Sequence, residues 1–119
     1  MLKTALACAT VPATDLERSA RFYEESLGLT GARLGLEGGL YYEAGGGTML
    51  HIYETSAATP GHTVAVFFVE DLDSVIAGLE ERGVVFEEGD SREVNPEDAE
   101  VRAGRFKDPD GNVVALRSY

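Results

Sequence analysis

Residues 15–25 read DLERSARFYEE and residues 71–81 read DLDSVIAGLEE, two stretches that align without a gap. The shift of 56 that aligns them also places Cys8 on Val64. A shift of 64 aligns later positions, placing Gly47 on Gly111, Leu50 on Val114 and His51 on Ala115. Similarity at such regular offsets along most of a 119-residue chain indicates a duplicated structural unit.

The first half reads as β-α-β-β-β. Residues 2–11 are apolar with β-branched residues near the end, which predicts a strand that Pro12 ends. Thr14 and Glu17 form a capping-box pattern, and apolar residues at helical spacing then predict a helix as far as Gly28. Three short strands are predicted next, around Leu34, at residues 40–43 and at residues 48–54.

The second half repeats this order after the break at Pro60 and Gly61. Asp71 is the expected N-cap of a helix that Gly83 ends. Asp108 and Asp110 belong to a turn motif, so we interpret them as structural. Strands are predicted at residues 63–69, 84–87, 101–107 and 112–116. The predicted fold is α+β, a single domain of two tandem β-α-β-β-β modules at residues 1–58 and 62–119.

The composition excludes several classes of partner. Ten Lys and Arg against 21 Asp and Glu give a net charge of −11, which repels nucleic acid and anionic membranes. No apolar run is long enough to span a bilayer. A single cysteine forms no intrachain disulfide, so a cytoplasmic location is expected. Between residues 80 and 100, nine acidic residues and two arginines leave a net of −7, which either serves solubility or attracts a cationic ligand.

Three segments carry a family resemblance: VPATDLERSARFYEESLGL (11–29), VEDLDSVIAGLEERGVVFE (69–87) and RFKDPDGNVVALRS (105–118). They resemble the vicinal oxygen chelate superfamily, which includes glyoxalase I, extradiol dioxygenases and the bleomycin resistance proteins. The resemblance implies that each module curls a mixed, antiparallel-rich sheet into a half barrel. It also implies where metal-dependent members place their ligands, which correspond here to Cys8, His51, Val64 and Ala115.

This set of positions is poor in metal-binding groups. Val64 and Ala115 have no donor atom, and a hard divalent cation needs more than Cys8 and His51. His62 lies two residues before Val64 and would replace it in a slipped register. We therefore expect no cofactor, and a divalent metal is not favoured.

The expected cavity is lined by strand residues. His51 and Tyr53 share one face of their strand, and only one of Tyr41 and Tyr42 faces the same side as they do. Cys8 is either a cavity residue or a small buried apolar one. The candidate ligand-binding residues are Cys8, His51, Tyr53, Val64, Phe67, Phe106 and Ala115.

Two classes of function fit this cavity. The resemblance favours a metal-independent protein that binds a drug or metabolite, cationic or aromatic, in the manner of the bleomycin resistance proteins. The alternative is an enzyme, either a metal-free isomerase or lyase with His51 as its general base or, less favoured, a metal-dependent lyase or dioxygenase. Family members commonly form homodimers, and the edges of an open sheet favour such pairing.

Overall fold

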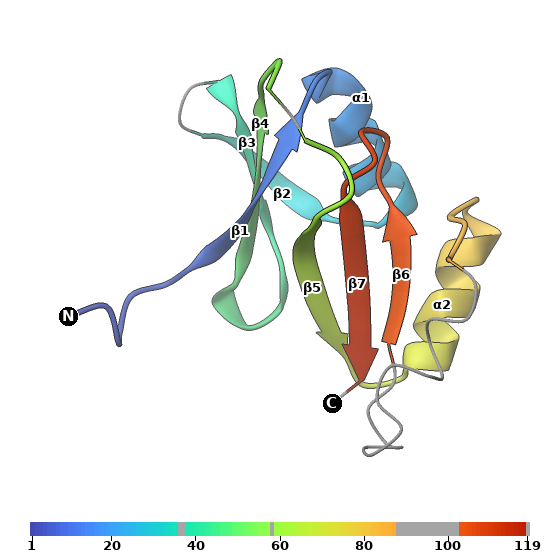
Figure 1. The fold of residues 1–119 in the computed structure, drawn as a ribbon. Helices are drawn as coiled ribbons and strands as arrows, with labels where there is room; N and C mark the ends of the chain where they lie inside the picture. The colour runs from blue at the N-terminus through green and yellow to red at the C-terminus, as the bar shows by residue number, and fades with distance from the viewer. Residues whose placement is uncertain (36–37, 58, 88–102, 119) are drawn as a thin grey trace. The chain divides into compact units, whose positions relative to one another are not determined.

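The computed structural model describes residues 1–35, 38–57, 59–87 and 103–118 (Figure 1). It divides into two compact units, Met1–Ala58 and Thr59–Tyr119. Each unit combines a helix with an open sheet of its own, which confirms the predicted α+β class. Among the described residues, no helix has the length and apolar character needed to cross a membrane.

The first unit is a four-stranded mixed sheet in the order β1-β4-β3-β2, with β1 parallel to β4 and the other neighbours antiparallel. Asp15 caps the helix, because its carboxylate accepts a hydrogen bond from the Arg18 N–H at 3.1 Å. Gly28 follows the helical segment with a φ of +77°. The elements are β1 (Cys8–Ala13), α1 (Leu16–Arg21), the π-helical turn η1 (Phe22–Ser26), β2 (Thr30–Leu34), β3 (Leu40–Glu43), the 3-10 turn η3 (Gly45–Gly47) and β4 (Met49–Glu54).

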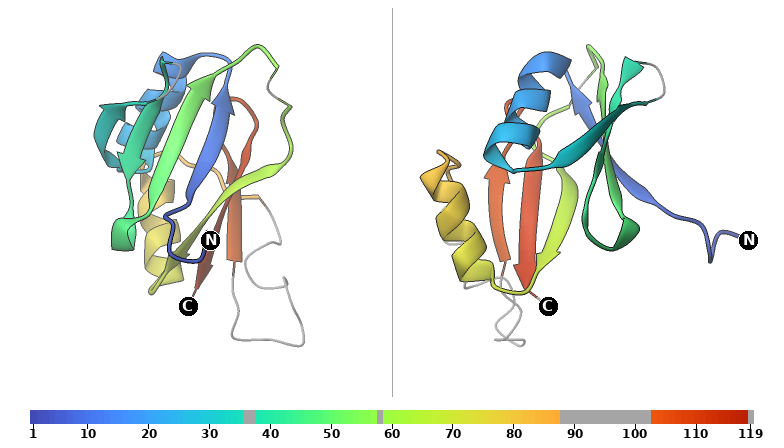
Figure 2. Two further views of the ribbon diagram at one scale, coloured as in Figure 1. Left: turned by 90° about the vertical axis from the view of Figure 1, so that its left-hand side faces the viewer. Right: turned by 180° about the vertical axis from the view of Figure 1, so that it is seen from behind.

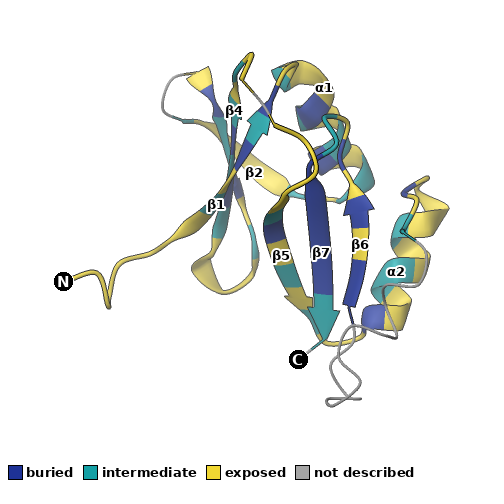
Figure 3. Ribbon diagram, in the orientation of Figure 1, coloured by how far each residue is buried: buried dark blue, intermediate teal, exposed yellow. Residues whose placement is uncertain are grey.

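One face of this sheet forms the core of the first unit. Its most deeply buried residues are Val11, Ala13, Tyr42 and Ile52, followed by Leu50 (burial is coloured in Figure 3). The Tyr42 hydroxyl donates a hydrogen bond to Glu24 in η1 at 2.7 Å, and Glu54 accepts one from the Leu16 N–H at 3.0 Å. The helical segment therefore covers this face (Figure 2) and leaves the opposite one, which we call the open face.

The second unit is a three-stranded sheet in the order β5-β7-β6, with β5 parallel to β7 and β6 antiparallel to it. Asp71 caps its helix by accepting a hydrogen bond from the Ser74 N–H at 3.2 Å. A Cβ on Gly104 would lie 3.2 Å from the Ile76 side chain, so α2 packs closely on β6. The elements are β5 (Thr63–Val69), α2 (Leu72–Glu81), β6 (Ala103–Lys107) and β7 (Val113–Ser118).

Asp108 holds the turn between β6 and β7. Its buried carboxylate accepts hydrogen bonds from the N–H groups of Asp110 and Asn112, at 2.9 and 3.0 Å, and from the Asn112 side chain at 2.9 Å. These bonds satisfy donors that would otherwise be buried unpaired. Asp108 thus has the structural role that the turn motif predicts.

Strand pairing follows the two sequence shifts. The shift of 56 carries β1 onto β5, and the shift of 64 carries β3 and β4 onto β6 and β7. Three strand pairs show this correspondence between the units. Thr10–His51 corresponds to Val66–Ala115, Tyr41–His51 to Arg105–Ala115, and Tyr42–Leu50 to Phe106–Val114. The duplication seen in the sequence is therefore a duplication of hydrogen-bond register.

The predicted first strand is wrong at both ends. β1 begins at Cys8, six residues later than predicted, where its partner β4 begins at Met49. It then continues through Pro12 to Ala13. Proline is tolerated here because β1 lies at the edge of its sheet, so one side of the strand needs no hydrogen-bond donor.

The first helix also differs from the prediction. Asp15 is the N-cap rather than Thr14, whose hydroxyl instead accepts a hydrogen bond from the Arg18 guanidinium at 3.2 Å. The α-helix becomes a π-helix at Phe22, which changes the regular spacing of its apolar face.

In the second unit, the predicted strand at residues 84–87 is reduced to a single bridge between Phe86 and Phe106. Val84 lies just after α2 and is tied to its last turn, because its N–H donates a hydrogen bond to the Leu79 carbonyl at 3.1 Å. The last strand is Val113–Ser118 instead of residues 112–116. Of the predicted strand at 101–107, residues 101 and 102 lie outside the described residues.

Candidate functional site

The open face of the first sheet carries a row of polar and aromatic side chains. Across the four strands, Thr10 pairs with His51, His51 with Tyr41, and Tyr41 with Arg33. Paired residues point to the same side of a sheet, so this row runs from one edge strand to the other. Tyr53, two residues beyond His51, lies on the same face.

The aromatic rings of this face form a stacked series. The ring centroids of Tyr41 and His51 are 4.4 Å apart with an interplanar angle of 25°, and those of His51 and Tyr53 are 6.0 Å apart at 19°. Such offset stacking fixes the ring orientations beyond what burial alone provides. Tyr42 points to the opposite face, so Tyr41 is the tyrosine of this pair that shares a face with His51.

His51 is held partly by glycine. Its Nε2 atom is buried and has no hydrogen-bond partner among the described residues. A Cβ on Gly39 would lie 2.6 Å from that atom, so the glycine backbone lies directly against the imidazole. A ligand cannot reach Nε2 in this conformation, which weighs against a general base acting through that nitrogen.

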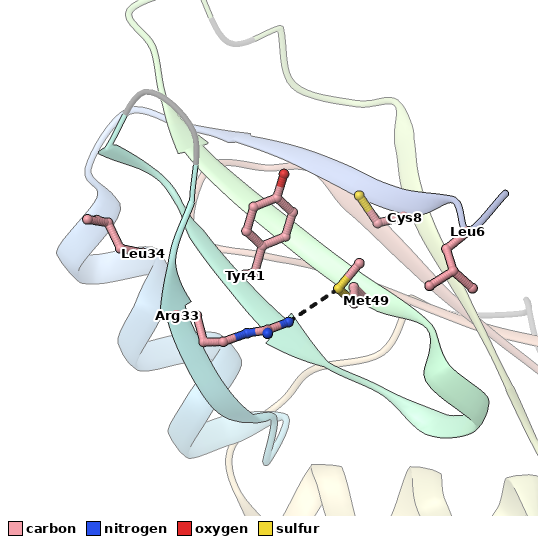
Figure 4. A pocket seen from close by; sticks show the side chains of 6 residues that line it. All are labelled: Leu6, Cys8, Arg33, Leu34, Tyr41 and Met49. Carbon is pink, nitrogen blue, oxygen red and sulfur yellow. Dashed lines mark hydrogen bonds between the residues drawn. The ribbon is translucent and has the colours of Figure 1, made fainter.

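A pocket of about 480 Å³ opens on this face at the side of the sheet where β1 begins (Figure 4). The Arg33 guanidinium crosses its floor and donates a hydrogen bond from Nη2 to the Met49 sulfur at 3.6 Å. An adjoining pocket of about 380 Å³ shares Leu6, Arg33 and Met49. The larger pocket is lined by Leu6, Cys8, Arg33, Leu34, Tyr41 and Met49.

Sequence reasoning found part of this site. It named Cys8, which is exposed and lines the pocket, and His51 and Tyr53, which lie beside the pocket on the same face. It left Tyr41 and Tyr42 as alternatives, of which Tyr41 lines the pocket. It missed Leu6, Arg33, Leu34 and Met49. The alternation of β4 places Met49 on the same face as His51, and this signal would have found it.

The remaining candidate residues lie in the second unit. Val64 falls at a register shift at the start of β5, while Ala115 pairs with Val66 on one side and Arg105 on the other. Phe106 is 1% exposed and packs edge-to-face on Phe86, with centroids 5.3 Å apart. Phe67 pairs with Leu116, so it shares the face of Phe106, opposite to that of Ala115.

The donor set does not fit a divalent metal. On the first sheet, Cys8 is opposite Met49 and His51 is opposite Thr10, so the two donors lie on a diagonal rather than side by side. The equivalent positions of the second unit are Val64 and Ala115, which offer no donor atom. His62 is exposed and precedes β5. Within the described part of the chain, no three His, Cys, Asp or Glu residues gather where they could hold an ion.

The chain matches a known family model over nearly its whole length. The model of the Glyoxalase/Bleomycin resistance protein/Dioxygenase superfamily matches residues 5–116. The chain belongs to this superfamily. No curated protein sequence matches it significantly.

Among solved structures, this glyoxalase-superfamily chain is similar to TnmS3, an antibiotic binding protein from Streptomyces sp. CB03234. The two are 30% identical, with a TM-score of 0.76, and the match covers 99% of this chain and 98% of TnmS3. A glyoxalase/bleomycin resistance protein from the same organism is 31% identical, with a TM-score of 0.71 over 94% and 98% of the two chains. Lactoylglutathione lyase from Agrobacterium tumefaciens shares the fold, at 21% identity and a TM-score of 0.77 over 99% and 96%.

Proposed function

We propose that this protein binds a small aromatic molecule on the open face of its first sheet, without a metal. The observation that carries the proposal is the position of Tyr41, which stacks on His51 and also lines the pocket. An aromatic ligand would gain from contact with this ring and with the apolar side chains of Leu6 and Met49. The similarity to an antibiotic binding protein supports a role in binding drugs or metabolites.

Substitution of Tyr41 tests this proposal directly. A thermal-shift screen of planar aromatic compounds should give hits, because a ligand at about 100 times its dissociation constant adds about 2.7 kcal/mol of stability. Tyr41→Ala should weaken these hits, whereas Tyr41→Phe keeps the ring and should bind like the wild type. If Tyr41→Ala binds every hit as tightly as the wild type, the site is not on this face.

Binding without a metal is a separate part of the proposal. It is supported by the chemistry of the four positions where related proteins are expected to hold a metal, two of which are Val64 and Ala115. Protein purified with added zinc, nickel, manganese and iron and then dialysed should retain no stoichiometric metal. One equivalent per chain that disappears in His51→Ala would overturn this part.

The proposal also distinguishes a binding protein from an enzyme. We expect each ligand to be recovered unchanged after incubation with the protein, because the buried Nε2 of His51 is closed to a reacting group. Mass spectrometry of the recovered ligand checks this. Conversion of a hit by the wild type, lost in His51→Ala, would establish the enzyme alternative.

Two further expectations belong to the proposal. A homodimer is supported by the open edges of both sheets, and a cytoplasmic location by the single cysteine. The acidic stretch at residues 80–100, which either serves solubility or attracts a cationic ligand, lies mostly outside the described residues. The groups around the pocket itself therefore bear more directly on ligand charge.

A further inference from the structure

Arg33 brings a positive charge to the pocket of a strongly acidic protein. It lies on β2 directly across from Tyr41 and lines both pockets of the open face. Its guanidinium carries five N–H donors. The acceptor it contacts is the Met49 thioether at 3.6 Å, and a thioether sulfur is a weak acceptor. The charge of Arg33 is thus left largely unmatched beside the aromatic ring.

The ion pair of Arg105 shows what Arg33 lacks. In the second unit, Arg105 occupies the position equivalent to Tyr41 and lies 3.9 Å from the Glu87 carboxylate. The acidic side chain nearest in this arrangement is Glu43, which lines the adjoining pocket together with Arg33 but does not line the larger pocket. No ion pair joins Arg33 to a carboxylate among the described residues.

We infer that the ligand class of this site is an aromatic carboxylate or phenolate, whose ring packs by Tyr41 while its anionic oxygen is held by Arg33. This inference rests on the proposed function. A guanidinium recognises a carboxylate through two parallel N–H···O bonds, which fixes orientation as well as charge. An anionic ligand is the opposite of the cationic ligand that the acidic stretch at residues 80–100 would attract. Comparing ligands of different charge therefore decides between these two hypotheses.

Three naphthalene derivatives with the same ring system and substituents of similar size make the comparison. They are 2-naphthoate, which is anionic, 2-naphthamide, which is neutral, and 2-naphthylmethylammonium, which is cationic. Titration calorimetry should show the order naphthoate, naphthamide, naphthylmethylammonium, from tightest to weakest. The net charge of −11 works against this order, because it attracts cations and repels anions over the whole surface.

Variants of Arg33 locate the effect. Arg33→Gln should weaken naphthoate at least about fivefold and leave naphthamide within about twofold, since a hydrogen bond to a charged group is lost at an exposed site. Arg33→Lys keeps the positive charge without the planar guanidinium, so its affinity for naphthoate should lie between those of the wild type and Arg33→Gln. Arg21→Gln, an exposed arginine on α1 at the other side of the sheet, is the matched control and should change nothing.

Ionic strength gives an independent reading. Raising salt from low to physiological strength should weaken naphthoate binding to the wild type, because it screens the attraction to Arg33. In Arg33→Gln only the repulsion by the acidic surface remains, so salt should strengthen naphthoate binding instead. This change of sign is specific to a local cation in an acidic protein.

The possible results separate this inference from the proposed function. Equal binding of all three compounds, lost in Tyr41→Ala and unchanged in Arg33→Gln, would overturn the role of Arg33 and leave the aromatic site standing. Tighter binding of naphthylmethylammonium would overturn the inference in favour of a cationic ligand. If no compound binds, or if Tyr41→Ala binds all three like the wild type, the proposed site fails and the inference fails with it.

Discussion

Gly39 occupies a position where a side chain would collide with the candidate site. A Cβ there would lie 2.5 Å from the Ile52 carbonyl oxygen and 2.6 Å from His51 Nε2, closer than real Cβ atoms come to any neighbour. The backbone oxygen cannot move without disturbing β4, so the imidazole and the strand must both adjust. The absence of a side chain at residue 39 is therefore part of what orients His51 between Tyr41 and Tyr53.

Gly39→Ala should consequently destabilise the protein by about 1–3 kcal/mol, the usual range for an overpacked site. Gly45→Ala is the matched control, because nothing lies within 4 Å of its Cβ position, and it should be neutral or slightly stabilising. Urea unfolding measures both, and the NMR signals of His51 should shift in Gly39→Ala alone. Equal stability of the two variants would show that the site adapts to the added methyl group.

Tyr42 joins the sheet to the helical segment on the covered side. Burial and the hydrogen bond to Glu24 both raise the pKa of the Tyr42 phenol. The Tyr42 phenol thus holds its proton more firmly in the folded state than in the unfolded state, in which tyrosines have a pKa of about 10. The stabilisation is complete below that pH and is lost as the pH rises above it.

Tyr42→Phe should therefore cost about 1 kcal/mol at neutral pH, since it removes one hydrogen bond to a charged group that is itself exposed. Above about pH 10 the difference from the wild type should shrink, because the stability lost on ionisation of the Tyr42 phenol is lost in the wild type alone. Unfolding free energies at several pH values measure this. Tyr41→Phe is the control, and a difference that does not change with pH would contradict the assignment.

At the scale of elements, the sequence predicted correctly those strand and helix bounds that depend on neighbouring residues. Residues 40–43 and 63–69 form strands within the predicted bounds, and the helix after Asp71 begins where its cap predicts. The errors occur where a distant partner decides. Residues 2–7 have strand composition but lie before the point where β4 begins, and of residues 84–87 only Phe86 forms a bridge, with the distant Phe106.

The candidate site was predictable to the same extent. Alternation along β1 and β4 identified Cys8, His51 and Tyr53, because faces alternate within any one strand. Arg33 was not found, because the register between β2 and β3 shifts between Thr30 and Arg33. A shift of one residue exchanges the faces of a strand, and no local pattern in the sequence reveals it.

The helix caps provide the prediction at this scale. Asp15 and Asp71 are equivalent in the repeat and make the same carboxylate to N–H hydrogen bond. Asp15→Ala and Asp71→Ala should each cost about 1 kcal/mol. Thr14→Ala should cost less, because Asp15 is the side-chain cap of α1 and the contact of the Thr14 hydroxyl with the Arg18 side chain is exposed. Chemical denaturation checks this, and a larger loss in Thr14→Ala would restore the capping box expected from the sequence.

At the scale of the whole molecule, duplication preserved the scaffold while the chemistry of equivalent positions changed. Tyr42 and Phe106 occupy the same register position and are both buried, as the packing of each sheet requires. On the other face, His51 corresponds to Ala115 and Tyr41 to Arg105. Core positions retained their apolar character, whereas the positions on the opposite face diverged and gave the first sheet its aromatic row.

The second sheet presents apolar side chains on this diverged face. Val66 is 44% exposed and Phe68 is 56% exposed, and the two point to the same side of β5. In the first unit the equivalent residues are Thr10 and Pro12, which are less costly to expose. Exposed apolar strand residues beside an open edge favour association with a second copy of the chain.

We therefore predict a homodimer that depends on these side chains. Sedimentation equilibrium of the wild type should give twice the chain mass of 12.7 kDa. Val66→Asp combined with Phe68→Asp should shift the equilibrium to the monomer, because association would bury two unpaired charges. Ala77→Asp, at an exposed position of α2, is the control for added charge and should remain dimeric. A wild-type monomer, or a double variant that still sediments as a dimer, would contradict the prediction, and circular dichroism shows whether the double variant is folded.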